Sequence, residues 1–392
     1  MTESTRTTTS TAPSGDGVPA LPPIYCPIQP SVHPAALVNR NAIQWMRDRG
    51  FCESPAVRRR LEVSNVAGFV ARILPQGDSS TLEAITKLHL WAFAFDDSIE
   101  QLAVRNLAEA ADRQSYLVRI LDAPRSALLA DDPYVHSFRE VWELFQDLAS
   151  PAVLRRWVEQ FRMFASGVVW GCVYRQLDVI PTSDTVTTIR IQDAAGGCTG
   201  TGLVEVAGRF EVADEDLARS DVRALTDMTH VILAWDNDIY SYPLESGKQI
   251  EHVNLVTTLV VHDSLTERQA LIKAINMRNR AMWCYTSHRR KVFAPEGGPL
   301  QRYLRGLDHL IRGHLDWALN STRRYDSGEH PVPALVLQEE SATQIDGHDL
   351  TQPIDLPTIR WWWDDIHGGT GGGERGLHAS SDSPSFDDRA PR

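Results

Sequence analysis

The feature that most constrains this chain is the helical spacing of its apolar residues, which continues with short interruptions from about residue 30 to about residue 326. The segment 80–100, "STLEAITKLHLWAFAFDDSIE", is long and strongly apolar, as a core helix is. The best strand candidate, "TTLVVHD" at 257–263, is also predicted to be helical in this context. Further helices are predicted at 35–50, 105–121, 134–148, 151–178, 214–242, 264–290 and 297–324. About ten helices with short joints and no internal repeat predict one all-α domain, a single-domain helical bundle.

Both ends of the chain differ in composition from this helical region. Residues 1–23 are rich in Ser, Thr, Pro and Gly, and they are predicted to form a disordered tail because they offer little apolar surface to bury. The helical domain is predicted to cover 24–335, and 336–392 is predicted to be a mostly flexible tail. Within that tail, the adjacent indoles 361–363 are expected to cover a hydrophobic core.

Charge and cysteine content narrow the range of partners. With 39 Lys and Arg against 51 Asp and Glu, the net charge is −12, which predicts no general affinity for nucleic acid or for an anionic membrane. A bound anion must therefore be held by a few local cations or by metal ions. The five Cys contain no CxxC pair, so neither a disulfide framework nor a zinc site is indicated. No apolar run approaches about 18 residues, and the N-terminal sequence has no hydrophobic signal core, so a cytoplasmic location is predicted.

The first motif with chemical content is "FDDSIE". On a helix, Asp96 and Glu100 lie four residues apart and Asp97 and Glu100 three apart, so the three carboxylates share a face. They follow the apolar stretch "LHLWAFAF", which favours a position inside a cleft, where like charges repel unless a cation binds between them. Oxygen ligands of this kind suit Mg²⁺. A solvated acidic helix end would have the same sequence, so the motif alone is weak.

The second motif is "WDNDIYSYPLESGK". Asn237, Ser241 and Glu245 are spaced by four and four, and each step of four turns the direction by about 40°, so an amide, a hydroxyl and a carboxylate form one stripe. These three oxygens could fill half of the octahedral shell of Mg²⁺. A polar helix end is the alternative interpretation, but this combination of residues is rarer than an acidic triplet.

The two motifs in this order resemble those of the class I terpene synthases, and of the bacterial terpene cyclases in particular. The resemblance covers roughly residues 30–326. Arg190, which precedes Asn237 by 47 residues, is similar to the diphosphate-sensing arginine of that family. Asp193 and Ala194, in "RIQDAAGG", are similar to the linker and effector positions at the break of the same helix.

Two later segments also resemble the family. "HVNLV" at 252–256 matches the segment that follows the second metal motif, and "WALNSTRRY" ends in a C-terminal Arg-Tyr pair, Arg324 and Tyr325. The resemblance implies a Mg²⁺-dependent terpene cyclase that ionises a prenyl diphosphate. Arg190 and Arg324 would bind the diphosphate by charge-assisted hydrogen bonds, and Tyr325 would donate its hydroxyl.

In the family, three Mg²⁺ ions join the diphosphate to the two motifs. The implied metal positions are Asp96, Asp97, Glu100, Asn237, Ser241 and Glu245. Asp96 would bind from one helix and Asn237, Ser241 and Glu245 from the facing helix. Asp97 and Glu100 would orient waters and cations.

A carbocation in a closed site needs an apolar wall with aromatic faces. Phe93, one turn before the acidic motif, and Trp317, ahead of the Arg-Tyr pair, are the predicted wall residues. Phe95, Trp91 and Trp235 are further candidates. Asp193 and the Ala194 carbonyl would lie near the nascent cation.

Three positions depart from the family pattern. Leu244 stands where the family has a basic residue before the glutamate, and Lys248, one turn on, is the candidate to replace that contact with the diphosphate. Pro243 deletes a helical hydrogen bond, so the helix must bend or end there, which makes Glu245 the least secure ligand. The spacing after Trp317 is one residue longer than expected, which leaves Arg323 as an alternative diphosphate contact.

Other functions remain open on the sequence. Farnesyl diphosphate is the favoured substrate, giving a sesquiterpene, and geranylgeranyl diphosphate, giving a diterpene, is the alternative. A chain-elongating prenyltransferase would have a second aspartate-rich motif, a phosphohydrolase would have clustered His and Asp, and no DxDD motif marks protonation-initiated cyclisation. A non-catalytic helical interaction protein is the remaining class. The expected assembly is a monomer or a homodimer.

Overall fold

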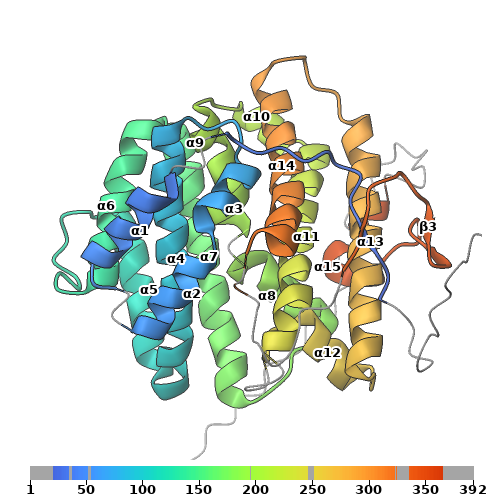
Figure 1. Cartoon of the computed structure of the whole chain (residues 1–392), viewed down its shortest axis with the longest axis horizontal. Coiled ribbons are helices and arrows are strands. Elements are labelled where there is room, and N and C mark those ends of the chain that lie inside the picture. Colours follow the sequence, from blue (N-terminus) through green and yellow to red (C-terminus); the bar gives the residue numbers. More distant parts are fainter. Residues whose placement is uncertain are drawn as a thin grey trace, which may run out of the picture.

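The computed structural model of the chain describes residues 21–34, 38–51, 54–194, 196–245, 251–322, 324 and 335–364, and the side chains of 38–40 and 243–245 are not included. Within these residues the regular structure is almost entirely helical, so the predicted all-α fold is confirmed (Figure 1). The strand candidate at 257–263 lies mostly in a helix, as predicted.

The helices follow the predicted segments closely. They are α1 (Val38–Asp48), α2 (Pro55–Val63), α3 (Val66–Ile73), α4 (Ser79–Arg105), α5 (Leu107–Asp122), α6 (Pro133–Leu148), α7 (Pro151–Leu177), α8 (Ser183–Asp193), α9 (Val204–Gly208), α10 (Asp214–Ala218), α11 (Ser220–Glu245), α12 (Leu255–His262), α13 (Glu267–Lys291), α14 (Pro299–Asn320) and α15 (Pro357–Arg360). The sequence did not predict the short helices α2, α3, α9 and α15, and α8 was implied only by the family resemblance.

Local sequence explains where the long helices begin. Asp78 caps α4 by accepting a hydrogen bond from the Thr81 backbone amide, and Ser150 caps α7 in the same way. Thr266 and Gln269 form a reciprocal capping box at the start of α13. These caps satisfy backbone groups that the first turn of a helix leaves unpaired.

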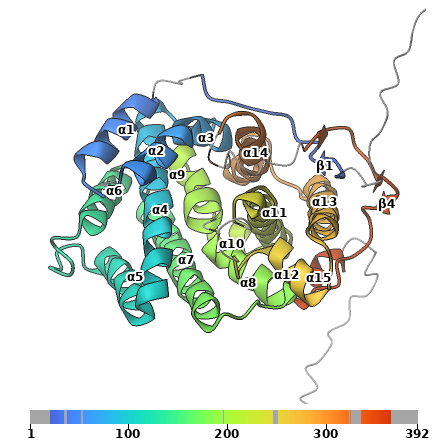
Figure 2. The same cartoon turned by 60° about the horizontal axis from the view of Figure 1, so that its bottom comes forward.

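Long and short helices together surround the middle of the molecule. Figure 2 shows α3, α4, α7, α8, α11 and α14 grouped around the middle of the molecule, with α1, α5 and α6 outside α4 and with α13 outside α11. Glycines permit two of the closest approaches. A Cβ on Gly313 of α14 would lie 2.5 Å from the backbone of Arg72, and a Cβ on Gly167 of α7 would lie 2.7 Å from the Asp193 amide. Because glycine has no side chain, α14 can pack directly on the backbone of α3, and α7 can pack directly on the end of α8.

The helix that begins at Ser183 is interrupted. α8 ends at Asp193, a π-helical turn η1 follows at Gly196–Gly200, a 3-10 turn η2 at Thr201–Leu203, and α9 continues the path. The break expected at Ala194 is confirmed, since Ala194 is the residue that caps the end of α8. Such a break places backbone groups, rather than a continuous helix surface, beside the middle of the molecule.

Residues 336–364, which the sequence assigned to a mostly flexible tail, contain regular structure, while 365–392 lie outside the described residues. Strand β2 (Leu337–Gln338) pairs in parallel with β1 (Ile24–Tyr25), and β3 (Gln344–Ile345) pairs antiparallel with β4 (His348–Asp349). Trp362 and Trp363 in the 3-10 turn η3 (Trp361–Trp363) are buried, which confirms that the indole cluster covers the core, while Trp361 stays exposed. Indole burial anchors this segment although its composition is that of a tail.

The N-terminal boundary also shifts by a few residues. Pro23 accepts a hydrogen bond from Asn279, so the ordered chain includes residues that the sequence assigned to the disordered tail. The rest of that tail, 1–20, lies outside the described residues.

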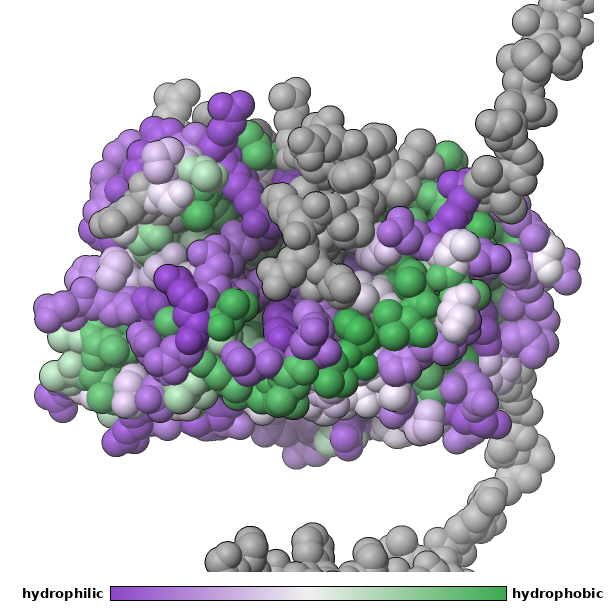
Figure 3. All heavy atoms as spheres, turned by 90° about the horizontal axis from the view of Figure 1, so that it is seen from below, coloured by the Kyte–Doolittle hydropathy of each residue, from purple (hydrophilic) through white to green (hydrophobic). Residues whose placement is uncertain are grey.

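The outer surface carries some exposed apolar side chains. Seen from below, hydrophobic residues form a band across the molecule (Figure 3). Leu177 at the end of α7 and Val261 in α12 are exposed at these lower helix ends. In the part of the chain that the structure describes, no helix combines the length and apolarity that crossing a membrane would require.

Candidate active site

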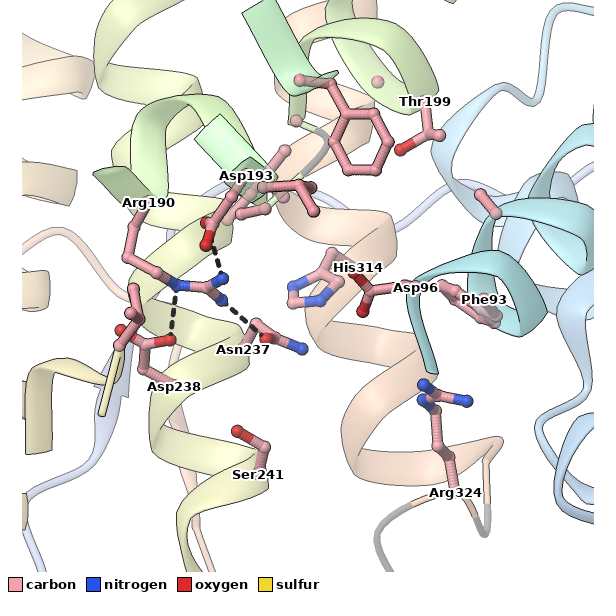
Figure 4. A pocket seen from close by; sticks show the side chains of 18 of the residues that line it. Phe93, Asp96, Arg190, Asp193, Thr199, Asn237, Asp238, Ser241, His314 and Arg324 are labelled. Atoms are coloured by element: carbon pink, nitrogen blue, oxygen red, sulfur yellow. Dashed lines mark hydrogen bonds and ion pairs between the residues drawn. The ribbon is translucent and has the colours of Figure 1, made fainter. Parts of the chain in front are cut away.

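A cavity of about 350 Å³ lies between the central helices. Its lining includes every predicted site residue whose side chain is described: Phe93, Asp96, Asp97, Glu100, Arg190, Asp193, Ala194, Asn237, Ser241, Trp317 and Arg324. Figure 4 shows Asp96 from α4 and Asn237 from α11 on opposite sides of the space. The two motifs therefore face each other across one cavity, although 140 residues of chain separate them.

On the α4 side, two of the three carboxylates are held by arginines. Asp97 lies 3.2 Å from Arg60 Nη1 and 3.9 Å from Arg324 Nη2. Glu100 lies 2.8 Å from Arg175 Nη2. These pairings fit the expectation that Asp97 and Glu100 orient neighbouring cations.

Burial disfavours the charged forms of two carboxylates in this motif, Asp96 and Glu100. Burial, reinforced by the neighbouring Asp97, raises the pKa of Asp96 to about 6. Burial also raises the pKa of Glu100 well above its ordinary value. A divalent cation would relieve this cost because it favours the charged form of both groups.

On the α11 side, Asn237 and Ser241 lie one turn apart and both line the cavity. Asp238 is almost fully buried beside them and accepts a hydrogen bond from the Leu255 backbone amide, which joins the start of α12 to this motif. Helix α11 is described as far as Glu245 and includes Pro243, while residues 246–250 lie outside the described residues, so the bend or end expected at the proline stays a prediction. The side chain of Glu245 lies outside the described residues.

Arg190 connects the helix break to the second motif. Its Nε donates to Asp238 Oδ1 at 2.9 Å, Nη1 donates to Asp193 Oδ1 at 2.8 Å, and Nη2 donates to Asn237 Oδ1 at 2.8 Å (Figure 4). Burial raises the pKa of Asp193 to about 6, although Arg190 opposes the shift. One guanidinium thus binds the end of α8 and two successive residues of α11.

A buried ion pair supports the second motif from behind. Arg278 Nε lies 2.7 Å from Asp236 Oδ1, and neither side chain is accessible to solvent. Arg278 also donates to the Tyr25 carbonyl, which ties the N-terminal strand to α13. Asp236 precedes Asn237, so this pair fixes the turn of α11 that presents the amide to the cavity.

The donor set is suited to magnesium. Asp96, Asn237 and Ser241 offer a carboxylate, an amide and a hydroxyl oxygen, with no sulfur or imidazole among the motif residues, and hard oxygen ligands favour Mg²⁺. Among the described residues, no three His, Cys, Asp or Glu side chains converge into a complete metal site. The donors are instead divided between two walls, an arrangement that a bridging phosphate ligand would complete.

Away from this charged rim, the cavity has an apolar wall. The rings of Phe93 and Trp317 lie 6.4 Å apart, and Phe69 from α3 lies 4.7 Å from Trp317 and 6.5 Å from Phe93. The guanidinium carbon of Arg324 stands 4.4 Å from the centre of the Phe93 ring, which orients the arginine between wall and rim. Both predicted wall residues therefore belong to the lining.

The other aromatic candidates lie elsewhere. Trp91 and Phe95 stack with ring centres 4.8 Å apart, and in the core between α4 and α6 Trp91 packs on Phe138 and Phe95 on Tyr134. Trp235 is fully buried and does not line the cavity. Lys248, Arg323 and Tyr325 lie outside the described residues.

Sequence reasoning missed several lining residues. Arg175 near the end of α7 binds Glu251 as well as Glu100, at 2.9 and 2.8 Å. Arg60 and Phe69 come from the unpredicted helices α2 and α3. Val253 and Asn254 also line the cavity, and they were within reach of sequence analysis because "HVNLV" was already recognised as a family segment.

An all-helical cavity with oxygen ligands on two facing walls and aromatic rings between them defines a class of metal-binding enzyme. The profile of the terpene synthase family 2 C-terminal metal-binding domain matches residues 87–282. Spiroviolene synthase of Streptomyces violens is 31% identical over 349 residues, which cover 88% of this chain and 97% of that protein. (+)-T-muurolol synthase of Streptomyces clavuligerus is 29% identical over 350 residues, covering 86% and 81%.

A solved structure agrees with these relatives. The crystal structure of the SVS_A2 protein, obtained by ancestral sequence reconstruction, superposes with a TM-score of 0.72 at 29% identity and covers 88% of this chain and 99% of that one. The chain belongs to the class I terpene synthases. It is therefore a lyase of the kind that acts on prenyl diphosphates.

Proposed function

We propose that this enzyme ionises a linear prenyl diphosphate in a Mg²⁺-dependent step and cyclises the resulting carbocation, with farnesyl diphosphate as the favoured substrate and a sesquiterpene as the product. The observation that carries the proposal is the composition of the cavity, which joins a charged rim to an aromatic wall in a single space. A prenyl diphosphate has the same two parts, an anionic head and an apolar chain.

The rim supplies the groups that bind the head. Arg190 and Arg324 line the cavity and would donate charge-assisted hydrogen bonds to diphosphate oxygens. Asp96, Asn237, Ser241 and Glu245 would hold Mg²⁺, three ions in all, which when bound would stabilise the negative charge that develops on the leaving diphosphate. Asp97 and Glu100, paired with arginines, would orient this set rather than bind metal directly.

Arg190 would also report the arrival of substrate. Its guanidinium is engaged with Asp193, Asn237 and Asp238. An incoming diphosphate would compete for the N–H donors of Arg190. A movement of Arg190 would then displace Asp193, the last residue of α8, and Ala194, which follows it. Substrate binding and the position of the helix break are thereby coupled through one side chain.

The wall would receive the hydrocarbon chain. Phe93 and Trp317 present aromatic rings to the cavity, and ring faces stabilise positive charge in a site from which water is excluded. The Ala194 carbonyl and Asp193 would lie close to the first cation. The shape of this wall would decide how the chain folds before each bond forms.

The proposal also specifies the length of the prenyl chain of the substrate. The name of T-muurolol synthase specifies (2E,6E)-farnesyl diphosphate as the molecule that it cyclises. We therefore place farnesyl diphosphate first, with geranylgeranyl diphosphate and a diterpene product as the alternative.

The experiment is incubation of the purified chain with geranyl, farnesyl or geranylgeranyl diphosphate and Mg²⁺, followed by mass analysis of the extract and measurement of released diphosphate. A cyclic C15 hydrocarbon or alcohol that disappears when EDTA is added is the expected result. A cyclic C20 product would reassign the substrate and keep the reaction. Absence of metal-dependent diphosphate release with all three substrates would refute the proposed function.

A further inference from the structure

One titratable side chain in the cavity has no part in the proposed binding of diphosphate or metal. His314, in α14, carries the single imidazole among the described lining residues. Figure 4 shows its ring directed into the space between Asn237 and Asp96. Its ring centre lies 6.0 Å from that of Phe69 and 6.1 Å from that of Trp317, so the imidazole borders the aromatic wall as well as the rim.

His314 differs from the other buried histidines in that neither of its ring nitrogens makes a hydrogen bond to a described residue, whereas His89 lacks a partner at Nε2 alone. Only 6% of the residue is exposed, and Nδ1 is buried without a hydrogen bond. The other buried histidines of the described chain each have a hydrogen-bond partner: His89 with the Ile85 carbonyl, His230 with Thr201, His252 with Asp178 and His288 with the Trp362 carbonyl. A buried polar group without a partner is costly, so its presence in the lining of a reaction cavity calls for a chemical role.

The surroundings of Nδ1 define the tautomer. Nδ1 lies 4.0 Å from Asp236 Oδ2, and Asp236 is itself paired with the buried Arg278. A carboxylate oxygen on this side favours the hydrogen at Nδ1 of the neutral ring, and the lone pair is then at Nε2. The same carboxylate would favour the imidazolium that forms when Nε2 gains a proton, while the charge of Arg278 opposes it.

We propose, on the basis of the function proposed above, that His314 is the general base that ends the cyclisation by removing a proton from the last carbocation. The C–H bond next to the cationic carbon breaks, its electron pair becomes the π bond of the new alkene, and the proton bonds to Nε2. No oxidant or reductant takes part. The proton passes to water when the product and diphosphate leave.

Burial supports this role. It lowers the pKa of His314 below its ordinary value, so the ring is neutral near pH 7 and its lone pair is available. A carbocation with an adjacent C–H is a far stronger acid than an imidazolium, so a weakly basic imidazole suffices. What the protein contributes is position, because the C–H bond that lies next to Nε2 determines which alkene forms.

The test compares His314→Phe and His314→Gln with His89→Phe as the matched control. His89 is also buried and the centre of its ring lies 5.4 Å from that of Phe69, but it does not line the cavity. Each variant is incubated with the prenyl diphosphate that the wild type accepts, and the product ratios are measured by gas chromatography and mass spectrometry. Deuterium labels at the carbons that lose hydrogen identify the site of deprotonation.

Both His314 variants are expected to lower the share of the wild-type alkene by about tenfold and to raise alkenes deprotonated elsewhere or alcohols from water capture, while diphosphate release stays measurable. His89→Phe should keep the wild-type ratios. Unchanged ratios in both His314 variants, or a wild-type product that is only an alcohol, would overturn the inference. If the wild type released no diphosphate, the proposed function would be contradicted instead. The failure of the inference about His314 and the failure of the proposed function are therefore distinguishable.

Discussion

The rim and the wall of the cavity are built on different principles. At the rim, charged side chains interlock across helices: Arg175 binds carboxylates from α4 and from the segment before α12, and Arg190 binds carboxylates from α8 and α11. In the wall, Phe69, Phe93 and Trp317 meet through ring contacts without any ion pair between them. The rim is therefore a network of ion pairs, whereas the wall is an uncharged aromatic surface whose contribution depends on its shape.

This difference separates two properties of the enzyme. A change in the rim alters the charge that the diphosphate and its metal ions meet, so it should act on ionisation. A change in the wall alters where the cation and its neighbours lie, so it should act on the choice between products. The predictions below test that division.

The largest effect is expected at the rim carboxylate that has no arginine partner in the structure as described. Asp96→Asn keeps the shape of the side chain but removes the charge that a divalent cation requires, and kcat/KM should fall about 1000-fold, measured as diphosphate release at saturating Mg²⁺. The control is Asp308→Asn, because Asp308 is also buried with a raised pKa but binds Tyr285 and Arg289 outside the cavity. Comparable losses in both variants would attribute the effect to folding rather than to the rim.

Arg175→Met should have the largest effect on stability. It leaves the partly buried Glu100 and Glu251 without their shared counter-ion, and the free energy of unfolding should fall by about 1 kcal/mol, measured by urea denaturation. Adding Glu100→Gln to this variant should restore part of the loss, because one of the two uncompensated charges is then removed. If the double variant is less stable than the single one, Arg175 does not act through this charge pairing.

Arg190→Lys tests the geometry of the rim at constant charge. Lysine cannot reproduce a planar guanidinium that donates to Asp193, Asn237 and Asp238 at once, and kcat/KM for diphosphate release should fall about 100-fold. Arg156→Lys is a control, since Arg156 binds Glu205 and Asp214 away from the cavity. Full activity of Arg190→Lys would show that only the positive charge matters there.

The sequence predicted the rim ligands because they depend on local geometry. Spacings of three and four on a helix place Asp96 with Glu100, and Asn237 with Ser241, whatever the tertiary structure is. The facing of the two helices came from the family resemblance. The partners of these residues could not be predicted: Arg175 meets Glu251 across 76 residues of chain, and no local pattern encodes that distance.

Phe69 and the structure of the C-terminal segment were not predicted either, each for its own reason. Phe69 was missed because α3 is a short helix of eight residues, whose period is too brief to recognise. The C-terminal segment was predicted to be a flexible tail because its composition is polar, but Leu337 pairs with Ile24 and the indole of Trp362 donates to Asp227. Such long-range contacts order a segment whose composition indicates a flexible tail. In the sequence, only the indole cluster at 361–363 indicated that this segment packs on the core.

The smallest effect on diphosphate release, and the sharpest test of the division, is expected in the wall. Phe93→Leu removes an aromatic face from the cavity, and the ratio of the main product to its competitors should change about tenfold, with a smaller change in diphosphate release. Phe95→Leu, the same substitution two residues further along α4, is the matched control because Phe95 stacks on Trp91 in the core. Because a tenfold ratio corresponds to only about 1.4 kcal/mol, a product analysis can detect a wall effect that a stability measurement would not assign. An identical product profile in both variants would remove Phe93 from the cation-binding wall and would leave Trp317 and Phe69 to account for it.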